Sequence, residues 1–182
     1  MKFEFLKNLL YRIRGSYTVE QLQKMGLKVG RNFEPQIGFE LDPSHCWLIS
    51  IGDDVTFGPH VQVLAHDAST CKHLGYAKIG RVNIGNRVFI GAGSIILPNV
   101  DIGDNVIIGA GSIVSRSLPS NSVCAGNPAV VLSTLEEFTS KNKILMEERP
   151  VYDETFTLRK NISGEKKQRQ CLELTDGIGF VK

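Results

Sequence analysis

The stretch from Ile84 to Pro119 reads IGNRVF, IGAGSI, ILPNVD, IGDNVI, IGAGSI and VSRSLP, and it decides the fold. All six hexads begin with an aliphatic residue, and four of them have glycine in second place. Neither the 3.6-residue period of a helix nor the two-residue period of a strand produces this pattern. A short strand followed by a tight bend does, with the first side chain pointing inward and glycine relaxing the backbone.

A longer repeat lies on top of the hexads, because GAGSI at 91–95 recurs at 109–113, eighteen positions later. Three six-residue faces then make one coil, and coils stacked about 4.8 Å apart bury the aliphatic positions in continuous ladders. Two earlier hexads begin at Ile51 and Phe57, but Ile51 and Ile84 are 33 positions apart, which is not a multiple of six. We therefore expect a loop at 67–80 to interrupt the coils. The alternative, a β-sandwich, would show turns every 8–12 residues or so, with less regular spacing.

Composition sets the broad class of the protein. The 182 residues carry a formal net charge of +2, and 42% are hydrophobic and 22% charged. These values exclude a wholly disordered chain and give no reason to expect nucleic acid as the main partner. The four cysteines form no CxxC pair, so neither a zinc knuckle nor a redox motif is encoded. Without an apolar run of about 18 residues or a signal-peptide cleavage site, we expect a cytoplasmic protein with reduced thiols.

The chain divides into a basic helical cap at 1–34, a glycine-rich β-solenoid at 35–133 and a charged C-terminal extension at 134–182. Thr18 and Gln21 have the capping-box spacing and predict a short helix to about Met25. An apolar helical face within residues 1–14 indicates either peripheral membrane contact or a cover over the open end of the coils. In the extension we expect a helix over 134–148, an edge strand over 151–158, and a polar, mobile segment from Lys160 to Gln170.

Three further motifs join the hexads in one resemblance. They are PSHCWLISIGDDVTFGPHVQVLAHDAST at 43–70, LGYAKIG at 74–80 and NSVCAGNPA at 121–129. From about Ser16 to Leu132 the chain resembles the hexapeptide-repeat acyltransferases, chiefly the sugar and capsule polysaccharide O-acetyltransferases and more distantly the galactoside and maltose acetyltransferases. The resemblance implies a left-handed parallel β-helix, acetyl-CoA as co-substrate, no metal, and a homotrimer with active sites between subunits.

His66 stands where the early hexads end and the loop begins. A neutral imidazole with a pKa near 6.5 can accept a proton from a hydroxyl that attacks a thioester, and the family has its catalytic base at the matching position. A structural loop histidine is the alternative. Asp67 and Asp42 are both candidates to orient this base, and the sequence does not choose between them. His45 and Trp47 either line the acceptor pocket across a subunit boundary or are a surface histidine and a core tryptophan.

The resemblance also implies a site for the cofactor. Ala92 and Ala110, one coil apart, match positions whose main chain contacts the pantetheine arm, and Ser115 and Arg116 match positions near its distal end. Tight packing at a coil corner would explain the small residues equally well. Relatives often carry Lys or Arg after the Asn-Pro-Ala element, whereas this chain continues with Val-Val-Leu at 130–132. Phosphate binding then depends on Arg116 or on tail lysines, which indicates weaker coenzyme A binding or a different acyl donor.

These features together predict an acetyl-CoA-dependent O-acetyltransferase that acts on a sugar hydroxyl of a surface polysaccharide, lipopolysaccharide or related saccharide. One alternative is an N-acetyltransferase of a nucleotide-linked amino sugar, with the same base and cofactor. Another is a zinc enzyme like the hexapeptide-repeat carbonic anhydrases, with His60 and His66 as ligands. The last alternative is a scaffold protein without catalytic activity. The Ala-His-Asp and Ala-Gly-Asn-Pro-Ala contexts favour the acyltransferase.

Overall fold

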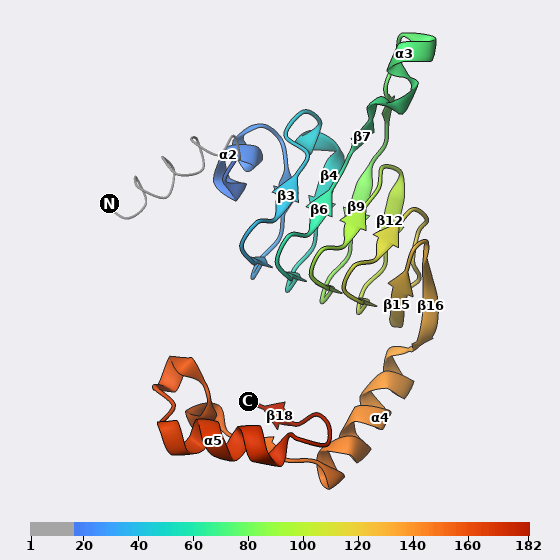
Figure 1. Cartoon of the computed structure of the whole chain (residues 1–182). Helices are drawn as coiled ribbons and strands as arrows, with labels where there is room; N and C mark the ends of the chain where they lie inside the picture. Colours follow the sequence, from blue (N-terminus) through green and yellow to red (C-terminus); the bar gives the residue numbers. More distant parts are fainter. Residues whose placement is uncertain (1–16) are drawn as a thin grey trace, which may run out of the picture. The chain divides into compact units, whose positions relative to one another are not determined.

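The computed structural model describes residues 17–182, so the helical face and membrane contact expected within residues 1–14 lie outside the described part. Two compact units divide the chain, one through Leu135 and the other from Glu136 to Lys182 (Figure 1). Within the described residues, no helix has both the length and the apolar character needed to cross a membrane.

The first unit is built from three parallel sheets, which the chain visits in turn with one short strand in each (Figure 1). After every third strand it returns to the first sheet, so each round is one coil. The strands of the four coils are β1 (Lys28–Val29), β2 (Glu34–Pro35) and β3 (Glu40–Leu41); β4 (Ile49–Ile51), β5 (Thr56–Phe57) and β6 (Gln62–Val63); β9 (Val82–Ile84), β10 (Phe89–Ile90) and β11 (Ile95–Ile96); and β12 (Val100–Ile102), β13 (Ile107–Ile108) and β14 (Ile113–Val114). The first strand therefore lies within the segment expected as a helical cap.

The predicted 18-residue repeat is confirmed by the strand register. Ile95 pairs with Ile113 and Phe89 pairs with Ile107, in parallel, so the third and fourth coils differ by 18 positions. The second and third coils are further apart in sequence, and the loop expected at 67–80 accounts for the extra residues. It contains β7 (His66–Asp67), η2 (Ala68–Thr70), α3 (Cys71–Leu74) and β8 (Lys78–Ile79), with β7 and β8 antiparallel. Figure 1 shows this loop projecting from the coils.

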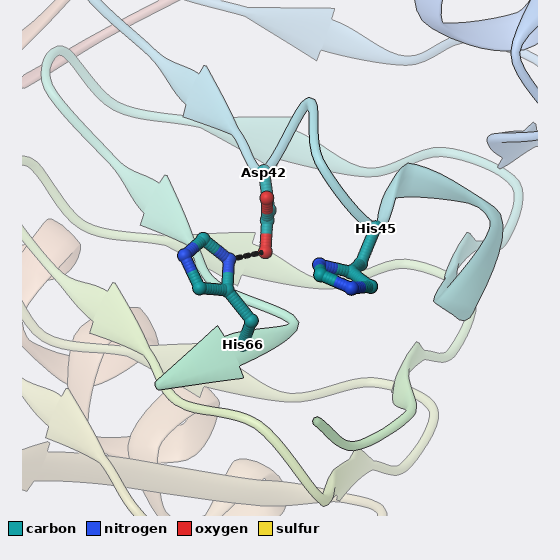
Figure 2. Close-up of side chains that lie close together, drawn as sticks. All are labelled: Asp42, His45 and His66. Carbon is teal, nitrogen blue, oxygen red and sulfur yellow. Dashed lines mark hydrogen bonds and ion pairs between the residues drawn. The ribbon is translucent and has the colours of Figure 1, made fainter. Parts of the chain in front are cut away.

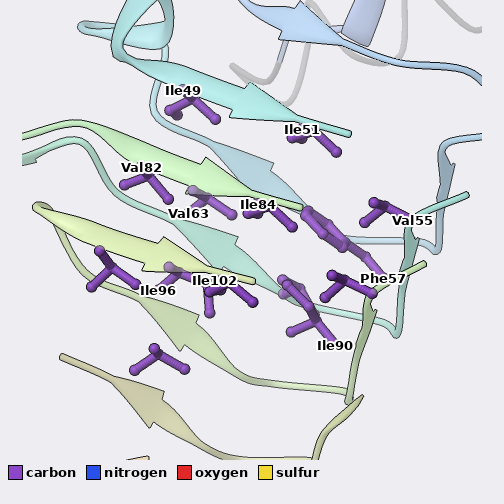
Figure 3. Close-up of a cluster of buried hydrophobic side chains, with 14 of the residues drawn as sticks. Ile49, Ile51, Val55, Phe57, Val63, Val82, Ile84, Ile90, Ile96 and Ile102 are labelled. Atoms are coloured by element: carbon purple, nitrogen blue, oxygen red, sulfur yellow. The ribbon is translucent and has the colours of Figure 1, made fainter. Parts of the chain in front are cut away.

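The aliphatic positions of the hexads form the buried core. Figure 3 shows these side chains inside the coils, with Ile90 and Ile96 completely buried and Ile84 and Ile102 nearly so. Each fully buried Val or Ile stabilises the fold by about 1.5–3 kcal/mol relative to an exposed one. Because every coil repeats the same inward positions, the core continues from one coil to the next.

Glycine at the second hexad position has a packing role. A Cβ on Gly91 would lie 2.4 Å from the backbone nitrogen of Ala110 in the next coil. Heavy atoms do not approach this closely, so only glycine allows successive corners to stack at the spacing of the strands.

Both ends of the coils carry additional structure. Helix α2 (Val19–Lys24) begins with the predicted capping box, in which Gln21 N donates to Thr18 Oγ1 and Thr18 N donates to Gln21 Oε1. At the other end, β15 (Ser122–Gly126) joins the second sheet parallel to β13 and pairs antiparallel with β16 (Ala129–Thr134).

The second unit is more regular than its charge-rich sequence indicates. The predicted helix over 134–148 is confirmed as α4 (Leu135–Glu148), while the expected strand over 151–158 is limited to β17 (Val151–Tyr152), which pairs with β18 (Phe180–Val181). Between these strands lie η3 (Glu154–Phe156), η4 (Leu158–Lys160) and α5 (Gly164–Glu173).

The segment from Lys160 to Gln170, expected to be polar and mobile, is largely helical, because α5 begins at Gly164. Ser163 caps this helix by accepting from Lys166 N. The ring of Phe156 packs beneath the cationic groups of Lys166 and Arg169, at 4.7 and 5.7 Å from the ring centroid. A cap and an aromatic contact thus order a sequence with few apolar residues.

Candidate active site

The strand register brings Asp42 and His66 to the same edge of one sheet. Leu41 in β3 pairs with Val63 in β6, and Asp42 N donates to Val63 O at 2.9 Å. Asp42 directly follows β3, and His66 comes soon after β6. Two residues 24 positions apart in the sequence are therefore neighbours at one corner of adjacent coils.

The Asp42 carboxylate accepts from three nitrogen donors, of which Figure 2 shows the His66 ring. His66 Nδ1 and Ala65 N lie 2.5 and 3.0 Å from Oδ2, and Ser44 N lies 2.9 Å from Oδ1. Burial disfavours the ionised carboxylate, but the hydrogen bonds from these three groups outweigh that effect and hold the pKa of Asp42 below its usual value. Asp42 is therefore an anion that accepts, and this requires a proton on His66 Nδ1.

The opposite ring nitrogen of His66 is available for chemistry. With the proton on Nδ1, the neutral ring carries its lone pair on Nε2. Among residues 17–182, Nε2 makes no hydrogen bond, and the side chain is 35% exposed while that of Asp42 is fully buried. The arrangement presents an oriented base at the surface and keeps its anionic partner away from water.

Asp67, the other candidate for orienting His66, is engaged elsewhere. Its Oδ2 lies 2.6 Å from Lys78 Nζ across the β7–β8 pair, and its Oδ1 accepts from Ser69 N. The Lys78 ammonium, followed by the Ser69 donor, holds the pKa of Asp67 far below its usual value. Lys78 was not singled out in the sequence, although its position at the far end of the expected loop is where an antiparallel partner of Asp67 would lie.

His45 and Trp47 lie beside the dyad, on the turn between β3 and β4. The rings of His45 and His66 are 5.4 Å apart between centroids, and those of His45 and Trp47 are 5.3 Å apart. The expectation of a core tryptophan does not hold, because Trp47 is 52% exposed. Figure 2 shows the His45 ring next to both Asp42 and His66.

Asp42, His45 and His66 are also the one group within the described chain whose ligand atoms are close enough to surround a metal ion, all within 4.8 Å of one another. Two ligands of a tetrahedral zinc ion at about 2.1 Å would lie roughly 3.4 Å apart. The 2.5 Å between Asp42 Oδ2 and His66 Nδ1 is instead a hydrogen-bond distance. His60, the second ligand in the alternative of a zinc enzyme, is exposed and does not belong to this group.

The residues expected to contact the cofactor fall on two different corners. Ala92 and Ala110 are exposed at the corner before β11 and β14, and Gly111 N donates to Ala92 O, so the two corners stack directly. Ser115 and Arg116 follow β14, at the edge where Asp42 and His66 also lie. Arg116 is exposed and forms no ion pair with any residue in the described range. The two corners are separated by a strand and its flanking residues, roughly 15 Å at the rise of an extended chain.

Comparison with known proteins assigns this chain to a family. The family model described as bacterial transferase hexapeptide (six repeats) matches residues 81–116. Protein CapG of Staphylococcus aureus is 37% identical over 146 residues, which cover 78% of this chain and 83% of CapG.

Solved structures agree with this assignment. A maltose O-acetyltransferase from Clostridium difficile 630 is 34% identical with a TM-score of 0.51, over 60% of this chain and 59% of its own. A hexapeptide-repeat acetyltransferase from Vibrio cholerae, VCA0836, shares the fold at 24% identity with a TM-score of 0.55, over 60% of this chain and 61% of its own. The chain therefore belongs to the hexapeptide-repeat family of transferases.

Proposed function

We propose that this protein is an acetyl-CoA-dependent O-acetyltransferase whose acceptor is a sugar hydroxyl, and that its coils form a left-handed parallel β-helix. The observation that carries the proposal is the Asp42–His66 pair, in which a buried carboxylate fixes the imidazole and leaves Nε2 open. The similarity to the maltose O-acetyltransferase supports a saccharide acceptor. Surface polysaccharides and lipopolysaccharides, or related saccharides, are the acceptor classes we propose.

In this mechanism His66 Nε2 takes the proton of the acceptor hydroxyl as its oxygen attacks the thioester carbonyl carbon. The tetrahedral intermediate collapses with cleavage of the carbon–sulfur bond. The departing sulfur takes the proton back from Nε2, which gives the acetyl ester and coenzyme A. Asp42 stays ionised throughout and stabilises the transient imidazolium. Base assistance of this kind is worth about 10²- to 10⁴-fold in rate.

The cofactor site we propose lies between two copies of the chain. Pantetheine would contact the main chain at Ala92 and Ala110, whose backbone N–H groups donate to no other residue within the described chain. Arg116 would bind a phosphate, since Val130–Leu132 supply no cation. These residues lie at two edges of one sheet, roughly 15 Å apart. In a homotrimer, the corner of one copy that carries Ala92 and Ala110 would face the corner of its neighbour that carries Arg116.

Acceptor-dependent thiol release from acetyl-CoA tests the proposal. The purified protein would be assayed with maltose, methyl galactosides, amino sugars and nucleotide sugars, beside His66→Ala. His73→Ala is the matched control, because His73 is an exposed histidine in the projecting loop. We expect His66→Ala to lose at least about a hundredfold in kcat and His73→Ala to keep wild-type activity. Equal thiol release by His66→Ala and wild type would overturn the assignment of the base.

A further inference from the structure

Trp47 is held firmly although its ring is exposed. Its neighbour Cys46 is completely buried, with Sγ 3.7 Å from Leu22 O and 3.6 Å from Met25 O. Leu48 N donates to His45 O and closes the short helix η1 (Cys46–Leu48). The exposure of the indole therefore results from where the fixed turn places it and not from a loose loop.

Close packing against the turn that follows α2 limits the positions open to Trp47. A Cβ on Gly26 would lie 2.9 Å from Trp47 Cβ, and Gly26 has a φ of +109°, which favours glycine. A large aromatic side chain is normally buried over most of its surface. Here the turn is closely packed, yet Trp47 is 52% exposed, and its ring contacts the ring of His45, which in turn contacts that of His66.

His45 fills the space between the indole and the proposed base. Its Nδ1 is buried and has no hydrogen-bond partner among residues 17–182. A buried nitrogen without a partner is unfavourable, and native structures rarely leave one without a reason. Rotation of the ring by half a turn about its Cβ–Cγ bond would place Nδ1 where Cδ2 now lies.

The turn itself depends on Asp42. The carboxylate that orients His66 through Oδ2 also accepts from Ser44 N through Oδ1. One buried anion thus positions both the base and the turn that carries His45 and Trp47. The same carboxylate therefore links the base to the start of the turn that carries the indole.

From this arrangement we propose that His45 and Trp47 form the acceptor subsite, with the indole face stacked on the apolar face of a pyranose ring and the His45 imidazole bound to one of its hydroxyls. The proposal rests on the proposed function and specifies where its acceptor binds. A flat apolar surface beside an imidazole with unused hydrogen-bonding capacity matches a ring that has C–H groups on its face and hydroxyls on its rim.

Trp47 is the single tryptophan of the chain, so its fluorescence reports on the subsite directly. Maltose, a methyl galactoside, N-acetylglucosamine and a short polysialic acid would each be titrated into the protein without acetyl-CoA. We expect saturable quenching or a blue shift with the sugar that is acetylated. An emission change without acetyl transfer would support the subsite while contradicting the proposed function. Emission unchanged by every sugar, or by a sugar that is acetylated, would overturn the subsite.

Kinetics of variants give the second measurement. We expect Trp47→Ala to raise the acceptor KM about 3- to 10-fold, Trp47→Phe to restore most of the loss, and the KM for acetyl-CoA to stay unchanged. His45→Gln should raise the acceptor KM for the saccharide but not for an analogue that lacks the bound hydroxyl. Ile37→Ala, an exposed apolar side chain on the turn between β2 and β3, is the control. An unchanged acceptor KM in Trp47→Ala, or dissociation of the oligomer, would overturn the proposal.

Discussion

Replacing Asp42 with asparagine keeps the shape of the side chain but replaces one of its two hydrogen-bond acceptor oxygens with an NH₂ group. The carboxylate accepts from His66 Nδ1 and Ala65 N on one oxygen and from Ser44 N on the other. An amide has one acceptor oxygen and a donor NH₂ group, so it cannot satisfy donors on both sides.

Each orientation of the amide has its own consequence. With the oxygen facing His66, the NH₂ opposes Ser44 N–H, and the unsatisfied donors cost about 1–3 kcal/mol of stability. With the NH₂ facing His66, Nδ1 must accept, so Nε2 carries the proton and no longer acts as a base. We therefore expect Asp42→Asn to lower kcat by about 10²- to 10⁴-fold through the second orientation, or to lose stability through the first.

The assay is acceptor-dependent thiol release at saturating acetyl-CoA, with urea unfolding measured in parallel. Asp67→Asn is the matched control, because Asp67 pairs with Lys78 at the surface and such pairs contribute at most about 1 kcal/mol. A fully active and fully stable Asp42→Asn protein would refute the reasoning. So would an equal loss of kcat in both variants.

The stability of the same carboxylate should depend on pH. The folded-state pKa of Asp42 lies below the ordinary value of 3.8, so its ionisation stabilises the fold above that value, and this contribution is lost as the pH falls through the folded pKa. The difference in unfolding free energy between wild type and Asp42→Asn should be constant near neutrality and shrink below about pH 3.8. Urea titrations at a series of pH values measure it, and a difference independent of pH would contradict this account.

Three further predictions concern the cofactor, the corners and the thiols. Arg116→Ala should weaken coenzyme A binding about 2- to 5-fold by calorimetry, the range for a solvent-exposed charge contact. Unchanged affinity would exclude Arg116. Gly91→Ala should cost about 1–3 kcal/mol, because its Cβ meets Ala110 N. The Cβ of Gly164→Ala meets nothing within 4 Å, so this variant should not lower the melting temperature. Equal melting temperatures of the two variants would contradict the packing. Aromatic disulfide reagents should modify two cysteines in the native protein and all four after unfolding, since Cys71 and Cys171 are exposed while Cys46 and Cys124 are buried; rapid native reaction of four thiols would contradict the fold.

The hexads were sufficient to predict the sheets because each coil repeats one local rule. An aliphatic residue faces inward and a glycine follows it, so Ile84, Ile90 and Ile96 reveal their burial from spacing alone. The candidate base could also be named, because His66 stands where the repeat is interrupted.

The partner of His66 could not be chosen from spacing, because Asp42 is distant in the sequence and Asp67 is adjacent to it. The choice depends on the register of β3 against β6, and residues inserted after each of these strands break the 18-residue rule there. The sequence left the exposure of Trp47 open for the same reason, since an inserted turn carries it outside the repeat. Helix α5 was missed because a cap and one aromatic contact stabilise it in place of an apolar face.

The most direct test of the central claim is the product formed on the acceptor. Wild type and His66→Ala would be incubated with acetyl-CoA and the best acceptor sugar, and the sugar analysed by mass spectrometry before and after mild base. The account predicts that wild type adds a base-labile acetyl ester and that His66→Ala forms it at least about a hundredfold more slowly. A base-stable acetyl amide, or equal ester formation by the two proteins, would contradict it.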